Sequence, residues 1–132
     1  MSTFLDTNVL IYAQGVGQKS DIARQAISPD AVISAQVLNE FSNVLHRKHG
    51  LGWELVAQRV AKLREILDPV FPLGAATHTK ALSLAQSYGF GFYDCLIIAS
   101  ALEAECDTLL TEDLQDGQRI EHLTVVNPFK SG

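Results

Sequence analysis

The sequence has few basic residues and lacks a long apolar run. Its 132 residues include 10 Lys and Arg against 15 Asp and Glu, a formal net charge of -5. This balance argues against a broad basic surface for nucleic acid, but it does not exclude a site whose acids hold metal cations. A transmembrane helix needs about 18 consecutive apolar residues. The longest run, residues 95–104, is interrupted by Ser100 and Glu103, so no membrane association is expected.

Cysteines are also scarce. Cys95 and Cys106 fit no metal-ligand spacing, and each lies within or beside an apolar helical segment, so we expect both to be reduced core residues. The sequence also shows no secretory signal, because no basic segment precedes the first apolar stretch and Asp6 and Asn8 interrupt it. These features predict a cytoplasmic protein.

The apolar content is sufficient for a packed core. At 132 residues and 47% hydrophobic content, folding should bury roughly two thirds of the surface of the unfolded chain, without a disulfide or metal. The chain has no linker, repeat or low-complexity segment, so we expect one domain spanning residues 1–132. Short apolar runs alternate with longer helical patterns, which predicts an α/β fold. Strands separated by helices imply right-handed crossovers and a parallel sheet.

The local patterns predict where these elements lie. Strands are expected at residues 3–5, 31–33, 69–71, 108–110 and 123–126. Helices are expected to begin at Asn8 and to cover residues 35 to about 49, 53–67, 75–88 and 92–105, with a loop at 14–18. Ser34 suits the N-cap of the second of these helices. The strand at 69–71 should lie at an edge, because Pro69 has no N–H to donate.

Two aspartates follow predicted strands. Asp6 comes directly after the first strand, and Asp113 follows residues 108–110 by a few positions. The carboxyl ends of parallel strands meet at one edge of a sheet, so the two carboxylates should converge there. An aspartate after a strand also commonly caps the next helix or turn, and the sequence leaves that alternative open.

Two further acids lie on apolar helical faces. Glu40 falls at the margin of an apolar arc, beside Val37 and Val44, and Asp94 shares a face with Ile97. A buried charge needs a partner. Asp94 could instead be a helix N-cap or a first-turn acid that the helix dipole favours, and the two roles are compatible.

Cations are absent from the sequence around these acids. No Lys or Arg lies within residues 1–18, 25–46 or 81–118, so salt bridges to sequence neighbours are not expected to neutralise them. Carboxylates gathered without cations favour a hard divalent metal, which for an incomplete oxygen cage means Mg²⁺ or Mn²⁺. The natural substrate of such a site is a phosphate ester, whose oxygens complete the coordination shell.

Four segments together resemble the PIN domain family, particularly its VapC-type toxins: residues 4–10 (FLDTNVL), 34–41 (SAQVLNEF), 93–101 (YDCLIIASA) and 109–114 (LLTEDL). The resemblance implies a doubly wound, mainly parallel sheet of about five strands with helices on both faces. It also implies an Mg²⁺- or Mn²⁺-dependent endoribonuclease that leaves a 5′ phosphate and a 3′ hydroxyl. A homodimer and a small VapB-like antitoxin are the expected protein partners.

The resemblance also assigns residues. The family's catalytic and metal-binding acids are matched by Asp6, Glu40, Asp94 and Asp113. Asn8 and Thr111 match polar positions that commonly support them. Glu40 could bind the metal or orient the attacking water, and the sequence does not separate these roles. Asp116 is either a further ligand or the cap of a turn in which Gly117 takes a positive φ.

Two other protein classes that share a strand followed by Asp are excluded by residues that they require. A haloacid dehalogenase phosphatase needs a second Asp where this chain has Asn8, and a receiver domain needs an Asp after its third strand and a Lys near its last, neither of which is present. The remaining alternative is a catalytically silent PIN fold that binds RNA or a protein. The basic run at residues 46–49 could contact RNA phosphates or simply suit the dipole at a helix end.

Overall fold

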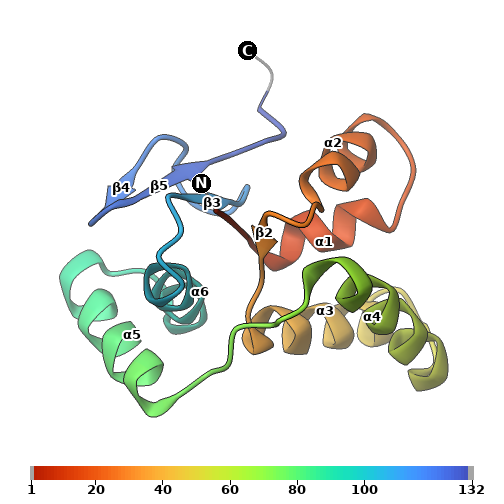
Figure 1. The fold of residues 1–132 in the computed structure, drawn as a ribbon, viewed down its shortest axis with the longest axis horizontal. Coiled ribbons are helices and arrows are strands. Elements are labelled where there is room, and N and C mark those ends of the chain that lie inside the picture. The colour runs from red at the N-terminus through yellow and green to blue at the C-terminus, as the bar shows by residue number, and fades with distance from the viewer. Residues whose placement is uncertain (1, 131–132) are drawn as a thin grey trace.

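A computed structural model describes residues 2–130 of the chain. In chain order its elements are β1 (Thr3–Leu5), α1 (Thr7–Ala13), α2 (Gln18–Ala26), β2 (Ala31–Val32), α3 (Ala35–Arg47), α4 (Trp53–Leu67), α5 (Ala75–Tyr88), α6 (Phe92–Glu103), β3 (Thr108–Leu110), β4 (Arg119–Ile120) and β5 (Leu123–Val126) (Figure 1). No helix within residues 2–130 is long and apolar enough to cross a membrane.

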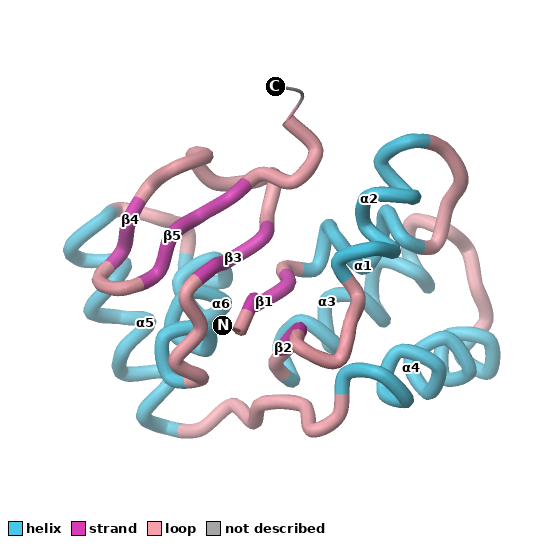
Figure 2. The backbone as a smooth tube through the Cα atoms, turned by 45° about the horizontal axis from the view of Figure 1, so that its top comes forward, coloured by secondary structure: helices cyan, strands magenta, loops and turns pink. Residues whose placement is uncertain are grey.

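The strands form one sheet in the order β2-β1-β3-β5-β4 (Figure 2). All neighbours are parallel except β4 and β5. The connection from β1 to β2 and the connection from β2 to β3 cross the sheet in opposite directions, so right-handed crossovers place their helices on opposite faces. Figure 1 accordingly shows α5 and α6 on one side of the sheet and α1 and α2 on the other. The predicted mainly parallel α/β architecture is confirmed.

The strands and all six helices contribute buried apolar side chains to one core, and α6 contributes an uninterrupted buried run. Phe4 and Leu109, which pair across β1 and β3, are fully buried. Every residue of α6 from 95 to 102 is buried, and burying a large apolar side chain contributes about 1.5–3 kcal/mol. Cys95 and Cys106 are buried and free, as predicted. This packing fixes the first turn of α6, which carries Asp94, against the sheet.

The prediction of a strand at residues 69–71 is wrong. This segment makes only an isolated parallel bridge, in which Phe71 pairs with Ser34. Phe71 N–H donates to the Ile33 carbonyl, but Pro69 has no N–H with which to extend the pairing. The strand that completes the five-stranded sheet is instead β4, which pairs antiparallel with β5. The turn between β4 and β5 contains Glu121 at φ 55°.

Three helix predictions also need correction. Helix α2 was not expected, because its sequence is mostly polar and buries only Ser20 and Ala23. Helix α3 ends at Arg47, two residues before the predicted end. Helix α6 ends at Glu103, and Glu105 takes a φ of 58°, which is incompatible with continuing the helix.

Candidate active site

Asp6 lies where β1 passes into α1. It is the N-cap of α1, its Oδ1 accepts the Thr7 N–H at 2.7 Å, and its Oδ2 accepts the Thr111 hydroxyl at 2.8 Å. Burial raises the pKa of Asp6 to about 7; these two hydrogen bonds oppose the rise, and the charges of Glu40 and Asp113 add to it. The carboxylate of Asp6 therefore caps α1 and at the same time lies near two of the other predicted site acids.

Thr111 and Asn8 connect the ends of β1 and β3. The fully buried Thr111 Oγ1 accepts hydrogen bonds from Asn8 Nδ2 at 3.0 Å and from the Asp113 N–H at 3.1 Å. Asn8 Nδ2 also lies 3.1 Å from Asp113 Oδ2, and Asn8 Oδ1 accepts the Glu112 N–H at 3.3 Å. These contacts place Asp113 beside Asp6 at the carboxyl edge of the sheet.

Glu40 reaches the same edge from α3. Its half-buried carboxylate accepts the Thr7 hydroxyl at 3.1 Å through Oε2 and the Gln36 amide at 3.1 Å through Oε1. Sequence reasoning missed both donors. Gln36 precedes Glu40 by one helical turn, and this spacing was a signal that could have identified it. Thr7 lies between two predicted site residues, but only the fold turns its hydroxyl toward Glu40.

Asp94 is the third residue of α6. Gly91 is the N-cap and supplies no side-chain hydrogen bond, so Asp94 is a first-turn acid and not the cap. Burial raises the pKa of Asp94, and the charges of Asp113 and Glu40 raise it further. Asp94 and Glu40 also line one hollow of about 530 Å³. Glu40 and Asp113 therefore lie within electrostatic range of both Asp6 and Asp94.

Asp116 makes different contacts. Its Oδ1 accepts the Asn127 N–H at 2.8 Å, and its Oδ2 lies 3.7 Å from Lys130 Nζ. Gly117 has a φ of 87°, the left-handed conformation that glycine adopts readily. These contacts connect the turn after β3 to the segment after β5.

The four acids offer only oxygen donors, which is the ligand type that hard divalent cations prefer. Among residues 2–130, no ion pair involves any of the four. As they lie, no three His, Cys, Asp or Glu side chains in this part of the chain form a metal-coordinating group. The pKa of Asp6 is raised by burial and, to a smaller extent, by neighbouring carboxylates, so a cation would stabilise its charged form; oxygen ligands suit Mg²⁺ or Mn²⁺. Chemically, such a site can bind a phosphate ester through the metal.

The fold and the site define an α/β protein with an acidic site at the carboxyl edge of a parallel sheet. The model of the PIN domain family matches residues 3–120, and the chain belongs to this family. No curated protein gives a significant match to the chain.

Solved structures share the fold. The chain is similar to a toxin-antitoxin complex from Klebsiella pneumoniae (TM-score 0.72, 22% identity, 98% of this chain and 100% of that chain). It is similar to VapBC-1 from nontypeable Haemophilus influenzae (TM-score 0.73, 21% identity, 98% and 100%). A third similar structure is VapC20 of Mycobacterium tuberculosis, a sarcin-ricin loop cleaving toxin (TM-score 0.67, 18% identity, 82% and 87%).

Replacing Thr111 by Val should destabilise the protein. The substitution keeps the side-chain shape but removes the donor to Asp6 and the acceptor for Asn8 and Asp113. Leaving buried polar groups unsatisfied costs about 1–3 kcal/mol, and this loss should appear in urea unfolding. Thr111→Ser, which keeps the hydroxyl, is the matched control. Equal stability of Thr111→Val and the wild type would contradict the role given to this hydroxyl.

Replacing Asp94 by Asn should raise the melting temperature of the metal-free protein at neutral pH. A carboxyl whose pKa is raised on folding binds more protons in the folded state. Stability therefore falls as pH rises from the unfolded pKa of about 4 to the folded pKa, and the penalty is complete above both. The gain in melting temperature should therefore be largest at pH values above the folded pKa of Asp94.

Melts in EDTA at pH 4 and pH 7.5 test this sign, because the gain should shrink at the lower pH. Mg²⁺ or Mn²⁺ should stabilise the wild type more than the variant. A lower melting temperature for Asp94→Asn in EDTA, with no metal shift in either protein, would show that Asp94 is only a structural first-turn acid.

Proposed function

We propose that this chain is an Mg²⁺- or Mn²⁺-dependent endoribonuclease and the toxin of a type II toxin-antitoxin pair. The observation that carries the proposal is the gathering of four acids, without a cationic partner among residues 2–130, at the carboxyl edge of the sheet. Membership of the PIN domain family and the shared fold with toxin-antitoxin complexes support it. The similar VapC20 structure is that of a sarcin-ricin loop cleaving toxin.

Asp6, Asp94 and Asp113 would hold the cation. When bound, a divalent cation supplies charge stabilisation to a phosphoryl group and lowers the pKa of a water molecule. The chain's own hydrogen bonds orient this set, since Thr111 fixes Asp6 and Asn8 fixes Asp113. Asp116 is left out of the proposed ligands, because its carboxylate already binds the segment after β5.

Glu40 is suited to a different task. Its two oxygens each accept one hydrogen bond, from Thr7 and from Gln36, so its orientation is fixed while further lone pairs stay available. A carboxylate held in this way can accept a proton from an attacking water or complete the ligand set. Hydrolysis would leave a 5′ phosphate and a 3′ hydroxyl.

The proposed protein partners are a second copy of the chain and a VapB-like antitoxin. The solved neighbours are themselves toxin-antitoxin complexes. Large apolar side chains are exposed on α5 and α6, with Tyr93 at 64%, Leu82 at 45% and Tyr88 at 42% exposure. Exposed apolar and aromatic side chains are typical of protein interfaces. A cytoplasmic location is part of this proposal, because the proposed substrate is RNA.

The purified protein should cleave RNA when Mg²⁺ or Mn²⁺ is present, and EDTA should stop the cleavage. Asp6→Asn and Asp94→Asn should each lower the rate by at least about 100-fold, since each removes a charge that positions the cation. Asp116→Asn is the control and should stay within a few fold of the wild type. Full activity in Asp94→Asn would refute the site assignment. RNA binding without cleavage by the wild type would favour the silent binding module.

Production of the chain without its antitoxin should arrest cell growth. The reason is that uncontrolled RNA cleavage depletes an essential RNA, so Asp94→Asn, made at the same level, should be harmless. Growth curves after induction check this, and sequencing of the new RNA 5′ ends would identify the cleaved bond. Harmless overproduction of protein shown to be active in vitro would contradict the toxin role.

A further inference from the structure

An acidic active site faces an electrostatic difficulty with a polyanionic substrate. The chain carries a net charge of -5, and four carboxylates lie close together at the site. Affinity for single-stranded RNA comes largely from Lys and Arg contacts to phosphates. Cations must therefore lie beside the acids if RNA is the substrate, and their position should mark the path of the strand.

Lys48, the C-cap of α3, is one such cation. Glu40, Val44 and Lys48 follow one another at intervals of four residues, so they share one face at the end of α3. All three line a hollow of about 390 Å³, and Asp113 lines it from the other side of the site. The face of α3 that brings Glu40 to the site therefore also brings an exposed ammonium group to the same depression.

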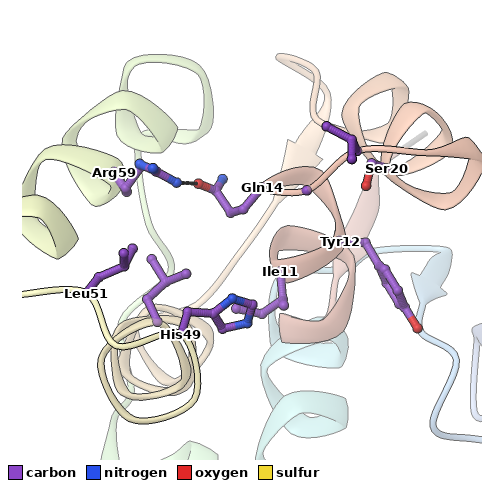
Figure 3. Close-up of a pocket in the computed structure, with 10 residues that line it drawn as sticks. Ile11, Tyr12, Gln14, Ser20, His49, Leu51 and Arg59 are labelled. Carbon is purple, nitrogen blue, oxygen red and sulfur yellow. Dashed lines mark hydrogen bonds between the residues drawn. The ribbon is translucent and has the colours of Figure 1, made fainter.

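A second hollow continues this depression away from the acids. It has a volume of about 470 Å³ and adjoins the first through Ile11 and Tyr12, which line both. Figure 3 shows that Arg59 enters it from α4, facing Gln14 at the end of α1, with His49 below. The depression therefore runs from the acids, past Lys48, to the guanidinium of Arg59.

The cations along this depression are available to an anionic ligand. Within residues 2–130, the cations Lys48 and Arg59 take part in no ion pair, whereas Arg64, on the same helix as Arg59, binds Asp68. Arg59 Nη1 donates to Gln14 Oε1 at 2.7 Å, which orients the guanidinium and leaves its other donors free. Such an oriented fork is suited to a phosphate.

We propose that the depression containing Lys48, His49 and Arg59 is a subsite for the phosphates of a single RNA strand on one side of the bond that is cut. The inference rests on the proposed ribonuclease function and adds the direction in which the substrate lies. Polar groups of Tyr12, Gln14 and Ser20 line the subsite beside these cations. Apolar side chains, among them Ile11, Leu45 and Leu51, line the rest of it. The unpaired cations beside the proposed phosphodiester-cleaving site favour RNA over a protein segment.

The test measures RNA affinity as a function of salt. The probe is a fluorescein-labelled single-stranded RNA of about 12 nucleotides, within the site sizes of single-strand binders. Binding is followed by fluorescence anisotropy with the full chain carrying Asp94→Asn, so that the RNA is not cut. In this background, Lys48→Gln and Arg59→Gln should each weaken binding about fivefold and reduce the slope of log affinity against log salt by about 0.7.

Matched variants separate phosphate contact from structural roles. Arg47→Gln removes a cation at the same end of α3 that lines neither hollow, and Arg64→Gln removes one from α4 that is already paired. Both should stay within about twofold of the background, because such charges are screened. Gln14→Ala breaks the Arg59 hydrogen bond but keeps the charge, so it should keep the salt slope, as should Arg59→Lys.

Unchanged affinity and slope in both Lys48→Gln and Arg59→Gln would overturn the subsite, and so would equal losses in the Arg47 and Arg64 controls. The subsite would also be overturned if these variants kept RNA affinity but lost neutralisation by the antitoxin, since the depression would then be a protein-binding groove. Cleavage by the wild type is measured separately. Wild-type cleavage together with unchanged variants would therefore refute the subsite and leave the ribonuclease function intact.

Discussion

The hydrogen bond from the Thr111 hydroxyl to the Asp6 carboxylate is the contact on which the candidate site depends. It joins the carboxyl ends of β1 and β3, the two central neighbours of the sheet, and both of its side chains are buried. The same hydroxyl accepts from Asn8 and from the Asp113 backbone, so one oxygen fixes the relative positions of two acids. Glu40 joins them because the next residue after Asp6, Thr7, donates to it.

This arrangement opposes folding. Carboxylates brought together with partial burial repel one another, and burial raises the pKa of Asp6 to about 7. The apolar packing of α6 against the sheet compensates, since the helix is buried along residues 95–102, directly after the acid that it positions. Sites that destabilise the fold in this way are typical of positions kept for function.

Helix α3 combines two opposite electrostatic roles on one face. Its middle turn presents Glu40 to the acids, and its end presents Lys48 to the adjoining hollow. A polyanionic strand bound there would meet the acidic centre and a protein-supplied positive charge two helical turns apart. The overall net charge of -5 therefore says little about how RNA would be held, because the local distribution of charge decides the contact.

The sequence by itself determined the alternation of strands and helices and the bounds of elements with strong periodicity. Helices α4 and α5 and strands β1, β3 and β5 lie where their patterns predict, because buried apolar faces impose a fixed period. The sequence also predicted that Asp6 and Asp113 converge, because each follows a strand of a predicted parallel sheet. Only the tertiary structure determined that α2 forms, that β4 pairs with β5 and that Phe71 makes a single bridge. The local sequence of these segments has a weak preference, so their conformation depends on the residues that pack against them. The tertiary structure also determined that Thr7 and Gln36 donate to Glu40. It placed Lys48 and Arg59 along one depression, because side chains distant in sequence meet only through packing.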